Sequence, residues 1–579
     1  MGRTATPGLA ASSLRQERVS LLWPGGPPRR QGDGLTSGAR ADLDLDEVLR
    51  LLTDEQSRRE RFVSSVLAEL ATDPEVIVYR QEAVTDLLED VQLRERLAGA
   101  LPGLTALTQE RSHSPRDNWS VLLIARRLAE LEIYVDVALR LRQALEAATI
   151  RSTALRGLLE HLIAVTDAPD FRSLQAQLPE LRANLEQAGS ITIGINLSRD
   201  LLPESAAIMS IKAEKIEGRG TLLERLFGGD SERRGITPLR LGDAGNIYSA
   251  ENRLFRDLRK LLELVTAPVG QVIDRYTSIN AQSLNTLEPE LSFLLNGIGL
   301  IERLREIGLP VCRPEVHDPD ERLTVLEDGY NVSLALRMAG SPAPEGEPAP
   351  QIVTNTIAFD GKHGRVWILT GPNRGGKTTY TRAVGLAHVL FQAGLYVPAR
   401  SARMSPVDMI YTHFPSQEGA QLGMGRLDEE AERLAAIFRA ATPHSLILLN
   451  EVLAGTSAIE ALGLALDAVR GLRLLGVRAI YTTHLHELAA SVDAINAGTS
   501  GDSTVASLVA DVEGDGVVIG TRHRRTFRIL PGPPRGVSYA SEIAEQHGIS
   551  FGQLASLLEQ RGVIRQIGSG STTGVSPAE

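Results

Sequence analysis

The sequence predicts a multidomain protein in which a long α-helical region, interrupted by a small β-containing insertion, precedes an α/β domain. Three observations support this prediction. The chain has 579 residues, which is more than one hydrophobic core usually organises. Apolar residues recur at helical spacing through much of the first half. From about residue 352 onward, short apolar strands alternate with helices, as in a largely parallel sheet.

The helical region extends over about residues 43–187. Its apolar residues recur in steps of three and four, while Arg and Glu occupy the opposite face, as in packed amphipathic helices. The clearest series is Leu122, Ala125, Leu128, Leu131, Val135 and Ala138. Aromatic residues make up only 4% of the chain, so aliphatic side chains must supply most of the packing. The pattern therefore predicts a helical bundle.

A short β segment interrupts this helical pattern. Residues 191–197 alternate between apolar and polar side chains, residues 206–211 have β-like composition, and residues 200–203 between them are typical of a turn. Helical periodicity returns over residues 250–307. A Pro-rich stretch at residues 341–350 then predicts a linker before the α/β domain.

Composition excludes several classes of protein. The single cysteine, Cys312, cannot form an intramolecular disulfide, and no Cys/His cluster has the spacing of a zinc site. No apolar run approaches the length of a membrane span, and the N-terminus lacks the apolar core of a signal peptide. We therefore expect a cytoplasmic protein with no membrane partner. The formal net charge of −11 means that any contact with nucleic acid must come from local basic patches.

A phosphate-binding loop follows the apolar strand at residues 366–369. Residues 370–379 read Thr-Gly-Pro-Asn-Arg-Gly-Gly-Lys-Thr-Thr and contain the pattern G-x-x-x-x-G-K-[ST]. Backbone N–H groups of such a loop surround phosphate oxygens, and the helix that follows adds partial positive charge. Lys377 is expected to reach the terminal phosphates of ATP, and the Thr378 hydroxyl to bind Mg²⁺. The predicted phosphate-binding residues are Gly371, Pro372, Asn373, Arg374, Gly375, Gly376, Lys377, Thr378 and Thr379.

Polar side chains end two further strands of the α/β half. An apolar strand at residues 445–449 ends in Asn450 and Glu451, the arrangement of a Walker B motif with Asn at the position that usually holds Asp. Glu451 is the candidate general base, and Asn450 is a neutral candidate partner for Mg²⁺. Another strand, at residues 477–483, ends in His484. Because the carboxyl ends of parallel strands share one edge of a sheet, His484 can reach the terminal phosphate.

The order and spacing of these three motifs resemble the MutS family of ABC-type ATPases. The motifs are TGPNRGGKTT at residues 370–379, LILLNEVLAGTS at residues 446–457 and YTTHLHEL at residues 481–488. The likeness extends upstream, where residues 78–88 are similar to the start of the family's core and lever region. Residues 190–211 stand where the family inserts its clamp, and residues 287–316 are similar to its returning segment. The resemblance covers about residues 41–560.

The resemblance implies a domain order along the chain. The expected parts are a mostly disordered N-terminal segment at 1–40, a helical core and lever at 41–189, a clamp-like insertion at 190–249, a returning lever and connector at 250–340, a P-loop ATPase domain at 341–560 and a disordered tail at 561–579. It further implies a homodimer in which each ATPase completes the other's site, with nucleotide opening and closing a clamp around DNA. Carried over by position, Glu451 activates water, His484 senses the γ-phosphate, and Thr378 and Asn450 attend to Mg²⁺.

The sequence departs from the family pattern at three places. The residues before the core cannot supply a mismatch-recognition domain, and we expect no nuclease-like domain after the ATPase. The family's trans-acting segment contains a Ser-Thr-Phe, where this chain has Gly425, Arg426 and Leu427. Either Arg426 replaces the missing serine as a charge that reaches the partner's γ-phosphate, or it is a solvated arginine at a helix start. Asn450 lacks the charge of the usual Asp, which predicts slow hydrolysis or a weak dependence on Mg²⁺.

Basic residues in the insertion are candidates for contacts with nucleic acid. They are Lys212, Lys215, Arg219, Arg233 and Arg234. Acidic residues are interleaved with them, so an ordinary solvated surface is the alternative interpretation. Phosphate contacts from such residues would position DNA without reading its sequence.

The favoured function is an ATP-dependent DNA clamp that acts on mismatched or branched DNA in repair or recombination. Two alternatives stay open. The chain is a nucleotide-dependent switch on structured RNA or the ribosome, or it binds ATP with little turnover, which the neutral Asn450 would favour. An ABC transporter subunit is not favoured, because the chain lacks a Ser-Gly-Gly-Gln signature.

Overall fold

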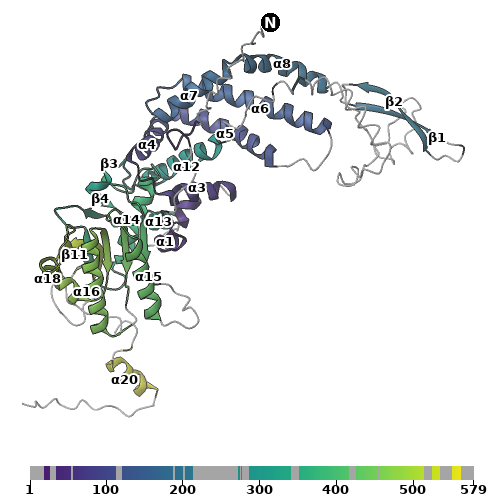
Figure 1. Ribbon diagram of the computed structural model, residues 1–579. Helices are drawn as coiled ribbons and strands as arrows, with labels where there is room; N and C mark the ends of the chain where they lie inside the picture. Colours follow the sequence, from purple (N-terminus) through teal and green to yellow (C-terminus); the bar gives the residue numbers. More distant parts are fainter. Residues whose placement is uncertain are drawn as a thin grey trace, which may run out of the picture. The chain divides into compact units, whose positions relative to one another are not determined.

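The computed structural model confirms a helical region followed by a mixed α/β region (Figure 1). The structure describes residues 19–26, 34–53, 57–112, 120–186, 190–197, 199, 203–212, 272–273, 276, 284, 286–340, 351–415, 426–453, 456–513, 524–534, 549 and 551–561. The chain divides into two compact units. The first comprises residues 1–27 and 85–295, and the second residues 28–84 and 296–579. No helix in these described ranges is both long and apolar enough to cross a bilayer.

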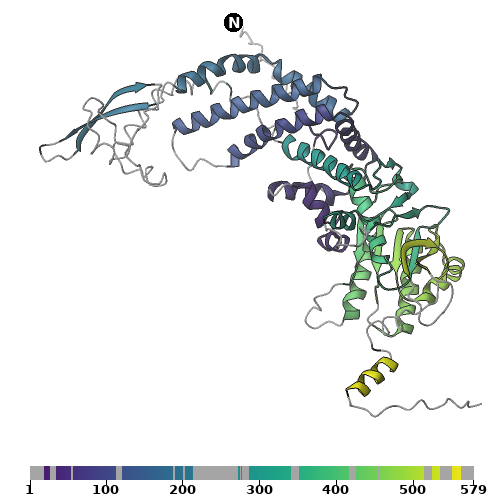
Figure 2. The same cartoon turned by 180° about the vertical axis from the view of Figure 1, so that it is seen from behind.

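The first unit is built from long helices. They are α5 (Val91–Ser112), α6 (Ser120–Glu146), α7 (Thr153–Thr166) and α8 (Pro169–Glu186), with the C-terminal part of α4 (Pro74–Glu89) and the start of α12 (Leu287–Glu306). Helix α6 packs against α5, α7 and α8 (Figure 2). A Cβ at Gly103 would lie 2.4 Å from Val137, so glycine allows α5 and α6 to approach closely. Between α6 and α8, Tyr134 and Phe171 pack edge to face with ring centroids 5.9 Å apart.

The β insertion is an antiparallel hairpin. Strands β1 (Ser190–Leu197) and β2 (Pro203–Lys212) pair from Ser190 with Lys212 to Leu197 with Pro203. Both strands lie where the change of period in the sequence predicts them. The pairing shifts register twice, which is typical of β-bulges.

Part of the N-terminal segment, predicted to be mostly disordered up to residue 40, is folded. Leu21 and Leu22 are buried in the first unit, where the Glu290 carboxylate accepts hydrogen bonds from the Ser20 hydroxyl at 2.8 Å and the Leu21 amide at 2.5 Å. Helix α1 (Ser37–Leu43) already belongs to the second unit. The prediction depended on the many Gly, Pro, Arg and Ser residues of this segment, but a short apolar run within it is still buried.

The second unit contains two sheets. The larger has the strand order β12-β11-β6-β10-β9-β8, in which only β12 (Arg524–Pro531) is antiparallel to its neighbour. The other strands are β6 (Val366–Thr370), β8 (Ile410–His413), β9 (Leu446–Asn450), β10 (Arg478–Thr482) and β11 (Val505–Glu513). All residues of β6, β9 and β10 are buried. Strands buried on both faces read as continuous apolar runs, which is why the sequence revealed them.

Helices cover both faces of this sheet. On one face, α15 (Arg426–Ala440), α16 (Ala458–Leu475), α17 (His486–Ala490) and α18 (Val492–Gly498) share a core with Ile368 and Leu449. On the other face lies α14 (Lys377–Gln392), where a Cβ at Gly385 would meet Leu43 of α1 and Leu448 of β9. A separate helix, α20 (Phe551–Gln560), follows near the end of the chain.

The N-terminal helices complete the second unit. They are α1, α2 (Asp46–Leu52), α3 (Ser57–Glu69) and the first part of α4. Asp42 accepts hydrogen bonds from Thr412 of β8 at 2.7 Å and from Arg433 of α15 at 3.2 Å. The ATPase domain expected from residue 341 is therefore joined by residues more than three hundred positions earlier in the sequence.

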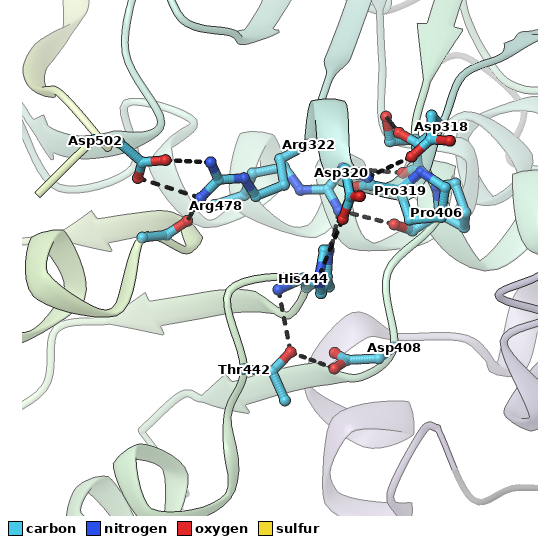
Figure 3. Close-up of polar contacts among 12 residues, drawn as sticks. Asp318, Pro319, Asp320, Arg322, Pro406, Asp408, Thr442, His444, Arg478 and Asp502 are labelled. Carbon is cyan, nitrogen blue, oxygen red and sulfur yellow. Dashed lines mark hydrogen bonds and ion pairs between the residues drawn. The ribbon is translucent and has the colours of Figure 1, made fainter.

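A smaller sheet has the order β3-β7-β4-β5. Its strands are β3 (Glu315–Val316), β7 (Ser401–Met404), β4 (Thr324–Gly329) and β5 (Asn355–Phe359), and helix α13 (Val332–Ala339) follows β4. The fully buried Arg478, the first residue of β10, joins this sheet to the larger one (Figure 3). Its guanidinium donates to the carbonyls of Ser405 and Pro406, each at 2.9 Å. The arginine thereby satisfies backbone groups at the end of the sheet opposite to the phosphate loop.

Candidate active site

The phosphate loop connects β6 to α14, as the sequence predicts. Gly371 has φ 140° and Gly376 has φ 94°, a backbone region that favours glycine. A Cβ at Gly371 would lie 2.6 Å from the Cβ of Ala510, and one at Gly375 would lie 2.9 Å from the Pro372 carbonyl. Side chains at these positions would force the loop open. The glycines thus fix a tight turn that leaves its backbone N–H groups and the N-terminus of α14 available to an anion.

Lys377 is buried at the start of α14, with 4% of its surface exposed. Its Nζ donates to the carbonyls of Gly371 at 3.0 Å and Pro372 at 3.1 Å. Burial lowers the pKa of Lys377 to about 8, although the Glu451 carboxylate 3.9 Å away favours the charged form. The ammonium group is therefore bound to neutral carbonyls of its own loop, which only partly offset the cost of burying its positive charge. Anionic phosphate oxygens would be better partners for it.

Thr378, the residue after Lys377, contacts Asn450. The Thr378 hydroxyl donates to Asn450 Oδ1 at 3.2 Å, and Asn450 is buried at the carboxyl end of β9. A hydroxyl and an amide oxygen are hard, neutral oxygen ligands that fit Mg²⁺ together with substrate phosphates and water. Within the described residues, no group of three or more His, Cys, Asp or Glu side chains could hold a metal alone. The pair therefore fits Mg²⁺ that arrives with a nucleotide.

Glu451 and His484 form the second pair. His484 Nε2 donates to Glu451 Oε1 at 2.8 Å. This hydrogen bond and the nearby Lys377 lower the pKa of Glu451, while partial burial opposes them. The carboxylate is consequently ionised near neutral pH and able to accept a proton. The structure brings His484, predicted to sense the γ-phosphate, into direct contact with the predicted general base.

Strand register brings Lys377 and the two pairs to one edge of the sheet. Thr482 of β10 is paired with Leu369 of β6 on one side and with Asn450 of β9 on the other. The Thr482 carbonyl accepts from the Glu451 amide at 2.9 Å, and its hydroxyl lies 3.2 Å from that of Thr381 in α14. The carboxyl ends of β6, β9 and β10 therefore end at the same level, which explains why residues more than one hundred positions apart share one site.

The site opens into a cavity of about 570 Å³. The phosphate loop and Glu451 form one part of its lining. Apolar and aromatic side chains form the rest: Tyr330, Leu334, Met338, Ile352, Val353 and Phe527. A volume of this size and a partly apolar wall are typical of sites for a small organic ligand. The cavity is thus suited to a nucleotide with its triphosphate on the loop and its base on the apolar wall.

The apolar wall was missed by the sequence analysis. Phe527 has φ 58° and 46% exposure, and Asn355 holds its segment in place. The Asn355 amide donates to the Phe527 carbonyl at 3.2 Å, and its oxygen accepts from the Ile529 amide at 2.7 Å. These residues come from β5 and β12 of two different sheets. No local pattern connects an asparagine with a phenylalanine 172 positions later.

Most of the predicted nucleic-acid contacts fall outside the described residues. Lys212 is the last residue of β2. Lys215, Arg219, Arg233 and Arg234 lie outside the described residues. Arg426, the candidate for a role in trans, is the first residue of α15, and its side chain also falls outside the description.

Comparison with known proteins identifies two parts of the chain. A family model for MutS domain V matches residues 367–514, and a model for the MutS2 N-terminal domain matches residues 72–307. The first match contains Lys377 and both pairs described above, and it begins at the second residue of β6. The second covers most of the helical region and the β1–β2 hairpin.

Similar curated proteins are named DNA mismatch repair protein MutS. The one from Chlorobium phaeovibrioides is 28% identical over 456 residues, which is 72% of this chain and 48% of that protein. The one from Acaryochloris marina is 26% identical over 514 residues, covering 83% and 53% respectively. The one from Granulibacter bethesdensis is 37% identical over 188 residues, covering 32% and 19%. The chain thus spans about half the length of these relatives, or less.

Proposed function

The chain belongs to the MutS family, and we propose that it is an ATP-dependent DNA clamp whose hydrolysis of ATP at a dimer interface drives opening and closing. Its MutS domain V is an ABC-type ATPase domain. One observation carries the proposal of ATP hydrolysis: Lys377, the Thr378–Asn450 pair and the Glu451–His484 pair meet at one edge of the sheet. The names of the relatives support DNA as the partner.

The chain's own residues perform the steps around the phosphates. Lys377 exchanges its two carbonyl partners for phosphate oxygens, since a charge-assisted bond is stronger than one to a neutral carbonyl. Thr378 and Asn450 would hold Mg²⁺, which would neutralise charge on the phosphates. The ionised Glu451 takes a proton from a water as the water oxygen forms a bond to the γ-phosphorus. The bond from that phosphorus to the bridging oxygen breaks, and ADP leaves with the electron pair.

His484 is proposed to have two roles, one toward the general base Glu451 and one toward the γ-phosphate. Its hydrogen bond orients the Glu451 carboxylate and keeps it ionised. The same hydrogen bond connects the general base to a phosphate that approaches the imidazole. We propose this as the physical form of the γ-phosphate sensing predicted for His484.

The clamp itself is assigned to the first unit. Its helices and the β1–β2 hairpin match the MutS2 N-terminal domain, and Lys212 ends the hairpin. The interleaved basic residues from 212 to 234 are proposed to contact phosphates without reading base sequence. Action on mismatched or branched DNA in repair or recombination is part of the same proposal.

The test is steady-state ATP hydrolysis with no nucleic acid, perfectly paired duplex, mismatched duplex, branched DNA and structured RNA. Glu451→Gln removes the base, and Glu487→Gln makes the same chemical change at an exposed position of α17. We expect mismatched or branched DNA to stimulate turnover. The Glu451→Gln variant should lose this turnover, and the Glu487→Gln variant should retain it. If only structured RNA stimulates turnover, the partner of this protein is RNA and not DNA. ATP binding without turnover under every condition would contradict the ATPase proposal and favour a binding-only switch.

A further inference from the structure

An acidic residue stands in the apolar face of helix α15. Leu434 and Ile437 of this helix belong to the buried core, and Leu427, Phe438 and Ala441 pack against it. Glu430 lies three residues after Leu427 and four before Leu434, so helical geometry places it on that same face. A half-buried carboxylate in such a stripe is costly unless it has polar partners.

The partner of Glu430 is the loop that follows the proposed general base. Its Oε2 accepts the backbone N–H of Leu453 at 2.8 Å. Leu453 has φ 64° and Glu451 has φ 54°, and both are residues with a Cβ in the left-handed region. Such conformations are strained for residues with a Cβ and persist only where the surroundings hold them.

Other bonds hold the remaining backbone groups of the same loop. The Glu451 amide donates to the Thr482 carbonyl at 2.9 Å, and the Tyr481 hydroxyl donates to the Val452 carbonyl at 3.3 Å. Tyr481 itself is buried, and burial followed by the charge of Glu430 raises its pKa. Thus strand β10 fixes the loop from one side, and α15 fixes it from the other through Glu430.

We propose that Glu430 is a positioning residue, which sets the orientation of Glu451 by holding the Leu453 amide and so couples α15 to the proposed hydrolysis of ATP. The proposal rests on the function proposed above. Helix α15 begins at Arg426, within the segment that the family resemblance assigns to action in trans. Arg433 of the same helix is anchored to Asp42 at 3.2 Å, which fixes α15 one turn beyond Glu430.

Two substitutions separate positioning from packing. Glu430→Leu fits the apolar stripe and removes the acceptor, while Glu430→Gln retains an acceptor oxygen without the charge. Glu432→Leu, on the exposed side of α15, is the matched control. We would measure kcat, KM, the Kd of a fluorescent ATP analogue, the unfolding temperature and the hydrogen exchange of amides 451–453.

In Glu430→Leu we expect kcat to fall roughly ten- to hundredfold, the effect of one lost hydrogen bond to a charged group. The Kd for nucleotide and the unfolding temperature should stay near their wild-type values, while exchange at amides 451–453 accelerates at least tenfold. Glu430→Gln should lie between wild type and Glu430→Leu, and Glu432→Leu should match wild type.

Unchanged exchange at amides 451–453 in Glu430→Leu would overturn the proposal, as would an unchanged kcat in an active enzyme. If Glu430→Leu does not fold, the same criteria apply to Glu430→Gln. Absence of turnover in the wild type would refute the proposed ATPase activity instead, and the exchange comparison would still decide whether Glu430 holds the loop.

Discussion

Asn450 offers the sharpest test of how the site uses Mg²⁺. The amide lies one hydrogen bond from the Thr378 hydroxyl, at 3.2 Å, and is only 5% exposed. Its position at the end of β9 is the one that usually carries a charged carboxylate in this kind of site. Asn450→Asp changes one atom group and adds a full negative charge with almost no change in volume. The substitution therefore isolates the contribution of charge to metal binding.

The expected size follows from Coulomb's law. Two unit charges about 4 Å apart interact by about 1 kcal/mol even at the dielectric constant of water, and a divalent ion doubles this to about 2 kcal/mol. At about 1.4 kcal/mol per tenfold change, the Mg²⁺ concentration for half-maximal activity should fall roughly thirtyfold. Burial would increase the attraction, so the value is a lower bound. Without Mg²⁺, the added carboxylate stands beside Glu451, and we expect a lower unfolding temperature.

The assay is a Mg²⁺ titration of ATP hydrolysis at saturating total ATP, with the unfolding temperature measured with and without Mg²⁺. A matched control is Gln175→Glu, which makes the same change from amide to carboxylate at an exposed residue of α8. A Mg²⁺ titration of Asn450→Asp that superimposes on the wild-type curve would refute the assignment of Asn450 to the metal. A Gln175→Glu curve shifted to the same extent would show that the change in overall charge is responsible.

Three further predictions address the wall of the cavity and the core. Phe527→Ala should weaken ATP binding about tenfold or more, because stacking of a nucleobase on an aromatic ring contributes about 1–3 kcal/mol. The binding of tripolyphosphate, which has no nucleobase, should stay unchanged. Equal weakening for both ligands would contradict a nucleobase site at Phe527. Arg478→Met removes the donor to two buried carbonyls and should lower the free energy of unfolding by about 2–6 kcal/mol, measured by urea denaturation. An unfolding curve like that of the wild type would contradict the role of Arg478 as the link between the sheets. Burial, and then Arg433, lowers the pKa of His413 to about 4, below its ordinary 6.5. The free energy of unfolding should therefore be unaffected by this ring above pH 6.5 and should decrease as the pH falls towards 4, by on the order of 2–3 kcal/mol, because the unfolded chain binds the proton more readily. In His413→Phe, the free energy of unfolding should change less with pH over this range.

Local patterns predicted the elements and the strand ends of the site. The β6–loop–α14 unit, the polar residues that end β9 and β10, and the β1–β2 hairpin all depend on periodicity or on motifs within about twenty residues. Because parallel strands end at a common edge, the positions of Asn450, Glu451 and His484 in sequence were enough to predict that they converge.

The parts that sequence could not predict depend on distant pairs. Asp42 with Arg433, Asn355 with Ile529, and Glu430 with Leu453 join residues on elements whose packing no local pattern specifies. Glu430 is visible in the sequence as an acidic residue that interrupts an apolar helical stripe. Only the folded structure shows which polar group its carboxylate binds. The predicted contacts with nucleic acid mostly fall outside the described residues and stay predictions.

The polar groups of the described site are hydrogen-bonded to one another and to the phosphate loop. Lys377 donates to loop carbonyls, Thr378 donates to Asn450, and His484 donates to Glu451. A triphosphate that binds here must take Lys377 from its carbonyls, and Mg²⁺ must take Thr378 from Asn450. Binding therefore exchanges one set of partners for another. Because Glu451 is held by His484 on one side and its loop by Glu430 of α15 on the other, this exchange can change the orientation of the base and the position of α15 together. A conformational change driven by nucleotide requires that the two arrangements differ in their affinity for it.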